Sequence, residues 1–374
     1  MPRSFDERLA RLRSRRMDNQ NVVLNSQGFG EAYEKRTSNK ATRYALGAMQ
    51  EVDPRSTEIS LEEAEKVERN LRDGLKSEGL YPDFRLQGSV PLNVHIRGAS
   101  DVDLLVIEGH YLRYEPCEGG LRNYSPYSGR GELVDDVLHL RAKSEDVLDR
   151  RFWGATVDKT PAKSIQLSDG AFRRKVDVVP ANWFDTGTYQ RTLVEAQRGV
   201  QIANKYTREH ISNYPFLYIS EVQSKARQTN EGARMGIRLA KNVKNDAEAD
   251  IELSSYDIGS LIYHCPDSYI THLVARDLMI LSGVERWFDE LSRDYARASS
   301  LMTPDGTRRV LDDSAKWDGL LKLSGEITEL AKAVERELAN PYDYAPVDRE
   351  TLRKRLNDNS IPLAPELVGG GIRF

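Results

Sequence analysis

Apolar residues recur every three or four positions in two separate parts of the chain, a periodicity typical of helices with one buried face. The first part covers roughly the N-terminal eighty residues. Residues 31–52 carry good helix formers, and Asp53-Pro54 is expected to end that helix. A further helix is predicted to begin at Ser60, which forms a capping-box pattern with Glu63. Its apolar positions are Leu61, Ala64, Val67, Leu71 and Leu75.

The middle of the chain has the pattern of strands. Alternating or short apolar runs predict four of them, at residues 84–87, 102–107, 164–167 and 173–180. A helix is predicted at 132–152. The segment 109–131 is rich in Gly, Tyr and Pro, and we expect it to be a mobile or ligand-facing loop.

Helical periodicity returns at Pro215 and predicts helices in the ranges 215–245, 254–265, 267–300 and 312–339. Several prolines then interrupt a tail that ends in GGGIRF, and we expect this tail to be extended. A small sheet between two helical parts indicates an α+β protein. We predict a core with N-terminal helices over residues 1–210, a helical lobe over 211–340 and a tail over 341–374.

Composition narrows the classes of partner. The 374 residues carry a net charge of only −4, so no sequence-wide attraction to nucleic acid is expected. Apolar runs fall far short of the roughly 20 residues of a membrane helix, and the basic N-terminus has no apolar stretch after it. Cys117 and Cys265 are too few for a disulfide framework. We therefore expect a cytoplasmic protein with reduced thiols and no membrane partner.

The clearest chemical signal is the pair Asp101 and Asp103 at the start of the predicted strand 102–107. Residues two apart on a strand point to the same face, so the two carboxylates lie near each other. Like charges at that spacing repel unless a cation lies between them. A hard divalent cation with oxygen ligands is the simplest such cation.

Asp177 is expected to supply a third carboxylate. It lies between Val176 and Val178 in a predicted strand, where an unpaired charge is costly. Three such acids are able to hold two metal ions roughly 4 Å apart, and Asp177 is suited to accept a proton from an attacking hydroxyl. Weaker candidates for the third acid, in less apolar surroundings, are Asp135, Asp136, Asp158 and Asp169.

Gly88-Ser89 follows the first predicted strand and is expected to open a short helix. Glycine lets the backbone approach a phosphate, while the serine hydroxyl and helix amides bind its oxygens. Each motif also has a structural interpretation: Gly-Ser is a common turn, Asp-x-Asp is common at strand edges, and Asp177 suits an ion pair with Arg173 or Arg174. Their combination in this order favours the functional interpretation.

Gly-Ser, eleven intervening residues, Asp-x-Asp and a later strand-borne Asp resemble the signature of the DNA-polymerase-β-like nucleotidyltransferases. Within them, the chain looks most like the bacterial cGAS/DncV-like enzymes, which make cyclic oligonucleotide signals in anti-phage defence. LQGSV is the sharpest match. The resemblance implies a polymerase-β-like core, with a small mixed sheet and flanking helices, packed on a C-terminal helical lobe. It also implies two Mg²⁺ or Mn²⁺ ions on Asp101, Asp103 and Asp177, and nucleotide binding at Gln87, Gly88 and Ser89.

The second half of the chain extends the resemblance. Arg234, Arg238 and Lys241 lie at near-helical spacing, which suits the binding of a phosphate. The family uses a helix lysine, followed by a Ser-Tyr pair at a helix start, to hold the triphosphate and stack on the base. Lys241, Ser255 and Tyr256 match those positions. Without the resemblance, Ser254-Ser255 is a plain N-cap and Lys241 a solvated charge.

The segment MTPDGTRR matches a loop in which these enzymes carry an acidic contact to the base. Asp305 is the residue in question. Pro-Asp-Gly is strong turn chemistry by itself, so a turn is the competing interpretation.

The resemblance implies an enzyme that joins NTPs, ATP and/or GTP or also pyrimidine NTPs, into a cyclic di- or trinucleotide with release of pyrophosphate in CBASS signalling. The alternative is a nucleotidyltransferase that acts on RNA ends, a protein or a small molecule. A non-catalytic nucleotide-binding scaffold is disfavoured because all three acids are present.

Partners and specificity follow from the same resemblance. Duplex DNA is not expected to bind, because two distant cysteines cannot build the zinc insertion of the animal sensor. Defence-operon accessory proteins are candidate partners for the C-terminal tail. Base choice and ring size are expected to depend on residues 109–131 and on the helical lobe, with the site in a cleft between sheet and lobe.

Overall fold

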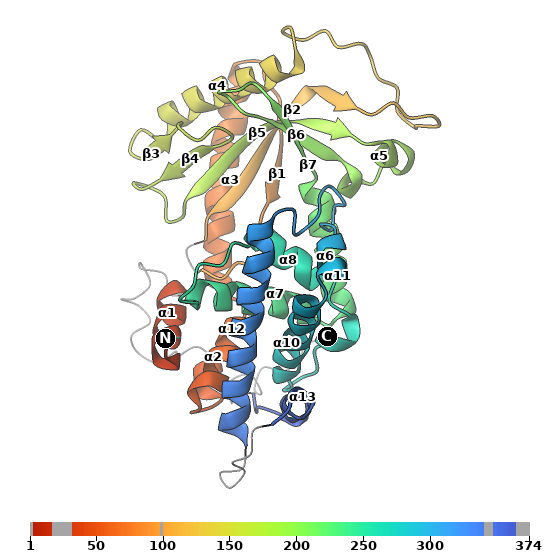
Figure 1. The fold of residues 1–374 in the computed structure, drawn as a ribbon. Helices are drawn as coiled ribbons and strands as arrows, with labels where there is room; N and C mark the ends of the chain where they lie inside the picture. The colour runs from red at the N-terminus through yellow and green to blue at the C-terminus, as the bar shows by residue number, and fades with distance from the viewer. Residues whose placement is uncertain (1–2, 17–31, 98–99, 340–346, 364–374) are drawn as a thin grey trace, which may run out of the picture. The chain divides into compact units, whose positions relative to one another are not determined.

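A computed structural model describes residues 3–16, 32–97, 100–339 and 347–363 of the chain (Figure 1). Its contacts form two compact units. The sheet unit consists of residues 53–93 and 99–221, and the helical unit of residues 1–52, 94–98 and 222–374. The contacts thus place residues 1–52 in the helical unit, whereas the division predicted from sequence placed all of residues 1–210 in the core.

The sheet unit is built on one mixed sheet of seven strands, in the order β1-β2-β5-β4-β3, with β6 paired to β5 and β7 paired to β6. Only β2 and β5 pair in parallel; the other neighbours are antiparallel. The strands are β1 (Asp83–Gln87), β2 (Val102–Tyr114), β3 (Thr156–Asp158), β4 (Ile165–Ser168), β5 (Val176–Asp185), β6 (Gly199–Ala203) and β7 (His210–Asn213). All four predicted strands are present, which confirms the α+β class.

Apolar residues on both sides of β2 explain why its sequence is a continuous hydrophobic run. Leu104 and Val106 pack in one cluster with residues of α3 (Pro54–Ser77) and α4 (Leu133–Arg151). Leu105 and Ile107 pack in a second cluster that contains Trp183. A strand buried on both faces is held in register by both clusters, so the residues at its start are fixed in place.

Helix α3 begins six residues earlier than the capping-box pattern predicted. Asp53 is its N-cap and accepts a hydrogen bond from the Arg55 amide at 2.8 Å, and Pro54 occupies the first helical position. Ser60 and Glu63 therefore lie inside the helix, where both are buried. The predicted start was wrong because a proline that ends one helix is also a favoured first residue of the next.

Strand β2 extends to Tyr114, so the predicted loop at 109–131 begins later than expected. It is also anchored at its base. The buried carboxylate of Asp185, at the end of β5, accepts hydrogen bonds from Arg198 Nε at 2.6 Å, Tyr124 OH at 2.9 Å and Arg122 Nη1 at 3.1 Å. We call residues 115–131, which follow β2, the arm. It projects beyond the sheet together with α5 (Gly187–Thr192) (Figure 1).

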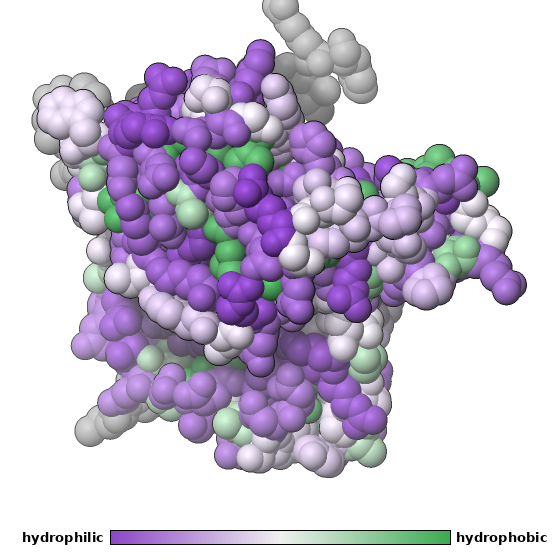
Figure 2. Space-filling view, turned by 90° about the horizontal axis from the view of Figure 1, so that it is seen from above, coloured by the Kyte–Doolittle hydropathy of each residue, from purple (hydrophilic) through white to green (hydrophobic). Residues whose placement is uncertain are grey.

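Seen from above, the arm carries hydrophobic and intermediate residues beyond a face that is mostly hydrophilic (Figure 2). Leu121 and Tyr127 are among its exposed apolar side chains. The arm leaves the sheet at the opposite end of β2 from Asp103. Over this stretch the partner strand β5 advances eight residues, from Asp177 to Asp185, which is roughly 26 Å at 3.3 Å per residue.

The helical unit contains most of the remaining helices: α1 (Phe5–Arg16), η1 (Ala32–Lys35), α2 (Lys40–Met49), α7 (Gly232–Asp246), α8 (Ser255–Tyr263), α9 (Asp267–Ile270), α10 (Leu278–Arg293), α11 (Tyr295–Ser300), α12 (Ser314–Leu338) and α13 (Arg349–Asp358). Helix α6 (Pro215–Gln228) begins in the sheet unit and ends in the helical unit. Among the described residues, no helix is long and apolar enough to cross a membrane.

Buried ion pairs fix the first helix to the rest of the helical unit. The carboxylate of Asp246, at the end of α7, accepts two hydrogen bonds from the Arg15 guanidinium of α1, at 2.7 and 2.9 Å. Tyr44 of α2 donates to the same carboxylate at 2.9 Å. Because Asp246 is fully buried, these donors are needed to offset its desolvation.

The sequence predicted an extended tail, but part of the tail is helical. Residues 349–358 form α13, whose Arg353 donates to the buried carboxylates of Glu285 and Asp289 on α10, at 2.7 and 2.9 Å. Leu352 and Leu356 of α13 are buried. The GGGIRF segment lies outside the described residues.

We expect Asp185→Ala to lower the free energy of unfolding by about 3 kcal/mol, because the change leaves the Arg198 guanidinium buried without its carboxylate. Urea unfolding followed by circular dichroism measures the change. Glu118→Ala is the matched control, because it removes the same charge from an exposed position of the arm. Equal losses in the two variants would contradict this role for Asp185.

Candidate functional site

One row of paired residues crosses three strands at one end of the sheet. Gln87 of β1 is the register partner of Asp103 in β2, and Asp103 is the register partner of Asp177 in β5. Register partners point to the same face of a sheet, and their side chains are neighbours. The structure therefore brings together three residues that the sequence analysis singled out from distant segments.

Asp101 lies immediately before β2, and its side chain is 54 % exposed, against 18 % for Asp177. The ammonium of Lys175 lies near both, with Nζ 3.9 Å from an Asp101 oxygen and 3.8 Å from an Asp177 oxygen. Lys175 was not predicted as a site residue. The alternation of a strand could have identified it, because residue 175 precedes Asp177 by two positions and so points to the same face.

Burial and mutual repulsion raise the pKa of the central carboxyls. The pKa of Asp103 rises from 3.8 to about 6, first because of desolvation and then because of the charges of Asp177 and Asp101, which Lys175 partly offsets. Desolvation also raises the pKa of Asp177, against the opposing effect of Lys175. Carboxyls in such a row are easily protonated unless a cation joins them.

The donor set fits a cation that binds oxygen ligands. Among the described residues, Asp177 Oδ1 is buried and has no hydrogen-bond donor. No three acidic, histidine or cysteine side chains in that part of the chain already surround a common point closely enough to hold a metal ion. Asp103 and Asp177 are thus the close pair of candidate ligands, and Asp101 lies at the margin of the site. The cation that the protein itself places near them is the ammonium of Lys175.

Gly88 supports the row through its backbone. Its φ of +84° is readily available only to glycine, and a Cβ at this position would lie 2.3 Å from Asp103 Oδ2. The expected short helix after Gly88-Ser89 is not formed. Residues 90–93 make a single turn, closed by a 2.9 Å hydrogen bond from the Asn93 amide to the Val90 carbonyl. Helix amides are therefore not available at this position.

The weaker acidic candidates have structural partners in the sheet unit. Asp135 completes the capping box of α4 and pairs with Arg208. Asp136 accepts a hydrogen bond from Tyr127 of the arm. Asp158 accepts hydrogen bonds from the amide and hydroxyl of Thr160 at 2.8 and 2.7 Å.

Lys241, in the helical unit, is buried rather than solvated. Its Nζ donates to the Val94 carbonyl at 2.7 Å. Desolvation lowers its pKa from 10.5 to about 8, with smaller contributions from Arg238 and Arg97. Arg238 is also buried and donates to the Met49 carbonyl at 2.7 Å. Arg234 is partly exposed and pairs with Glu231 at 2.5 Å.

Helix α8 presents the predicted Ser-Tyr pair in its first turn. Ser254 is the N-cap, and its hydroxyl accepts a hydrogen bond from the Asp257 amide at 3.0 Å, so this part of the structural interpretation is confirmed. Ser255 is exposed, and Tyr256 is half-buried. The Tyr256 hydroxyl donates to Asp305 Oδ2 at 2.5 Å, which joins two predicted nucleotide-binding residues.

Asp305 lies in a turn, as Pro-Asp-Gly predicted. The Gly306 amide donates to the Thr303 carbonyl at 2.7 Å, and Gly306 has a φ of +70°. Asp305 Oδ1 accepts hydrogen bonds from the side chain and amide of Thr307 at 2.9 and 3.1 Å. The carboxylate is therefore oriented by its own loop as well as by Tyr256.

The arm is distant from the carboxylate row within the sheet unit. It begins at the far end of β2 and is held there by Asp185 and by a 2.7 Å hydrogen bond from the Leu121 amide to the Gln190 carbonyl. The role of residues 109–131 in base choice stays a prediction, and the structure places these residues away from Asp103 within the sheet unit.

Comparisons with known proteins place the chain in a family. A family model described as the cGAS/DncV-like nucleotidyltransferase C-terminal helical domain matches residues 220–321. The cyclic dinucleotide synthase CdnE of Yersinia aleksiciae is 41 % identical over 334 residues, which cover 88 % of this chain and 86 % of that protein.

Two solved structures have the same fold. The STING-associated CdnE c-di-GMP synthase of Capnocytophaga granulosa is 25 % identical with a TM-score of 0.73, and the match covers 90 % of this chain and 100 % of that chain. The corresponding enzyme of Flavobacteriaceae sp. is 23 % identical with a TM-score of 0.74, covering 89 % and 99 %. These likenesses confirm the predicted fold class, and the second shows the fold alone.

We expect Asp103→Asn to stabilise the metal-free protein at pH 7.5 by on the order of 2 kcal/mol. The pKa of Asp103 is about 6 in the folded protein, against 3.8 for the ordinary group. Between these values the folded state binds more protons than the unfolded state, so its stability falls as pH rises. The advantage of the variant should therefore shrink as the pH is lowered from 7.5 to 4.

Urea unfolding in the presence of a chelator measures this effect at both pH values. Asp101→Asn is the control, because it makes the same change at a more exposed carboxyl of the same motif. A difference between Asp103→Asn and the wild type that does not change with pH would show that burial and repulsion do not raise the pKa of Asp103.

Proposed function

Because the chain belongs to the cGAS/DncV-like nucleotidyltransferases, we propose that it joins two nucleoside triphosphates into a cyclic dinucleotide and releases pyrophosphate. Membership of the family confirms the prediction that the protein is a nucleotidyltransferase. The relative at 41 % identity is a cyclic dinucleotide synthase, and the two structural relatives are c-di-GMP synthases. These relatives favour a ring of two nucleotides over a ring of three.

The alignment of Asp103 with Asp177 across parallel strands is the observation that carries the proposal. We assign Asp101, Asp103 and Asp177 as ligands of two Mg²⁺ or Mn²⁺ ions. When bound, such ions activate the attacking hydroxyl and neutralise charge on the leaving pyrophosphate. Asp177 Oδ1 accepts no hydrogen bond from the described residues, so it is suited to act as a metal ligand or as a proton acceptor. Lys175 balances the carboxylate charge beside them.

We assign nucleotide binding in the sheet unit to Gln87, Gly88 and Ser89. In the helical unit we assign it to Lys241, Ser255, Tyr256 and Asp305. Gly88 allows close approach of a phosphate because it has no side chain, and Ser89 offers a hydroxyl next to it. Ser255 is exposed in the first turn of α8, where a hydroxyl is able to reach a phosphate oxygen. Lys241 is the weakest member, since its ammonium already donates to Val94.

A role in bacterial anti-phage signalling follows from the same family. Both structural relatives are STING-associated enzymes, which supports a product that serves as a second messenger. The prediction that accessory proteins bind the C-terminal tail stays a prediction, and residues 364–374 lie outside the described part of the chain. Transfer to RNA ends, a protein or a small molecule is the alternative that the relatives disfavour.

Incubation of the purified protein with four labelled NTPs and Mg²⁺ or Mn²⁺ tests the proposal. We expect a small product that resists phosphatase, whose retained label identifies its bases. Asp101→Ala/Asp103→Ala should yield none of it, because two of the three metal ligands are gone. Linear products that phosphatase degrades would instead favour transfer to another acceptor.

Metal binding has its own prediction. Mn²⁺ added to the chelated wild-type protein should raise the midpoint of thermal unfolding, because a ligand that binds only the folded state stabilises it. The rise should be lost in Asp103→Asn/Asp177→Asn, which keeps the shape of both side chains without their charge. An equal rise in that variant would place the metal elsewhere in the protein.

A further inference from the structure

A loop of the helical unit holds Tyr256 from two sides. Residues 301–310 turn back on themselves through an isolated bridge between Met302 and Arg309, with the Val310 amide donating to the Leu301 carbonyl at 2.8 Å. Within this loop lie Asp305, which accepts the Tyr256 hydroxyl, and Arg308. We call residues 301–310 the Tyr256 loop.

Arg308 lies over the aromatic ring of Tyr256, with its guanidinium carbon 5.4 Å from the ring centre. A cation over the face of a tyrosine ring is attracted by the ring quadrupole. The ring is therefore held at its face by Arg308 and at its hydroxyl by Asp305. Two such contacts restrict the rotation of a side chain that has only two torsions.

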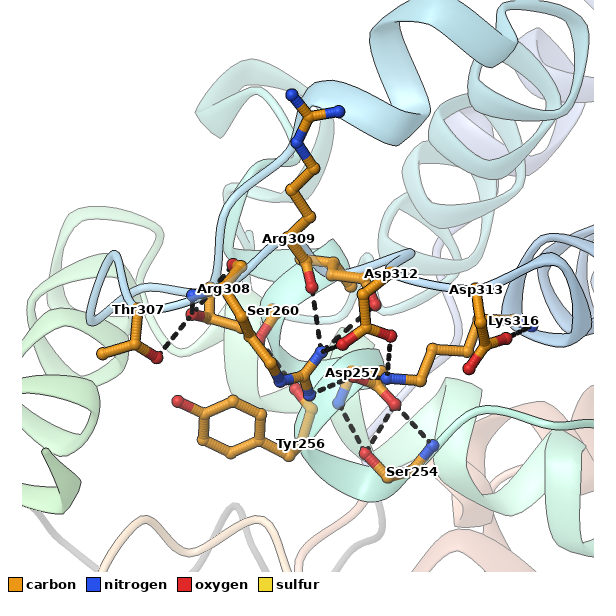
Figure 3. Close-up of polar contacts among 12 residues, drawn as sticks. Ser254, Tyr256, Asp257, Ser260, Thr307, Arg308, Arg309, Asp312, Asp313 and Lys316 are labelled. Carbon is orange, nitrogen blue, oxygen red and sulfur yellow. Dashed lines mark hydrogen bonds and ion pairs between the residues drawn. The ribbon is translucent and has the colours of Figure 1, made fainter. Parts of the chain in front are cut away.

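Arg308 is itself fixed by several partners (Figure 3). Its Nη2 is 2.5 Å from Asp257 Oδ1, and its Nη1 is 3.2 Å from Asp312 Oδ2. Nη1 also donates to the carbonyls of Arg309 and Val310, at 2.9 and 3.3 Å. A planar guanidinium with this many acceptors has little freedom to leave the ring.

The anchor of this network is the buried carboxylate of Asp257, the residue that follows Tyr256. Burial raises its pKa, but the hydrogen bonds from Ser254 and the contacts with Arg308 outweigh that effect, so the net pKa is lowered. Lys316 of α12 reaches both acids of the network, with Nζ 3.4 Å from Asp257 and 2.7 Å from Asp312. Charge is thus shared between α8, the Tyr256 loop and α12.

We propose that Arg308 is a positioning residue for nucleotide binding, and that it acts by fixing the ring of Tyr256 for stacking on a base. The inference rests on the proposed function. A ring that is already oriented loses less conformational freedom when a ligand binds, so the cost of binding falls. Arg308 does not need to touch the nucleotide for this effect.

The test compares Arg308→Gln with the wild type in binding the α,β-methylene analogues of ATP and GTP with Mg²⁺, by calorimetry. We expect Kd to rise about tenfold for the analogue that the wild type binds, the scale of a partly buried cation–π contact. Arg309→Gln is the matched control, because this neighbouring arginine is exposed and its side chain points away from the cluster (Figure 3). Its Kd should stay within about twofold of the wild type.

A double-mutant cycle separates positioning from general support of the fold. If Arg308 acts through Tyr256, adding Arg308→Gln to Tyr256→Ala should cause little further loss of affinity. Arg308→Lys should be intermediate, because it keeps a cation but cannot span the ring, Asp257 and Asp312. Thermal unfolding of each variant checks that the helical unit remains folded.

Three results would overturn the inference: an unchanged Kd in Arg308→Gln, a loss no larger than in Arg309→Gln, or losses for Arg308 and Tyr256 that simply add. Each is compatible with a wild-type enzyme that makes a cyclic product, so the proposed function would survive. A wild-type protein that binds neither analogue and makes no cyclic product would overturn both.

Discussion

The pairing of Asp103 with Asp177 is the constraint around which the sheet unit is organised. Two carboxylates are held in one row, although burial raises the pKa of both and the charge of Asp177 raises that of Asp103 further. Only strands that are themselves tightly fixed are able to hold such a pair. Leu104 to Ile107 supply that fixation, because they are buried in two separate hydrophobic clusters on opposite sides of β2.

The neighbouring backbone is adapted to the same pair. Gly88 passes so close to Asp103 that any side chain at residue 88 would collide with the carboxylate. The requirement for glycine therefore comes as much from the acid beside it as from the phosphate expected to bind there. Lys175 adds a cation to the row, so the folded protein partly neutralises the repulsion by itself.

Local patterns in the sequence predicted the elements that depend on local physics. The four predicted strand runs and the Ser254 cap were found, because buried runs and capping residues act within a few positions. The acids at 101, 103 and 177 were identified as unusual charges in apolar strands, but their register across parallel strands was not predictable, since parallel pairing joins segments that lie far apart in the chain. Three further features also depend on tertiary structure: the position of Lys175, the burial of Lys241 and the contact of Tyr256 with Asp305.

Helix α13 was missed because the prolines around it suggested an extended tail, whereas its stability comes from buried acids on α10.

The arm and the carboxylate row occupy opposite ends of the same two strands. Asp185 ties the base of the arm to the end of β5, so we expect a change at the tip of the arm to stay local and not to reach the start of β2. The sheet therefore separates the carboxylate row, which must keep its geometry, from the arm, where we expect an insertion to be tolerated. A reporter peptide or an affinity handle placed in the arm would leave the chemistry of the row undisturbed, which makes this loop the natural site for labelling the protein in its working state.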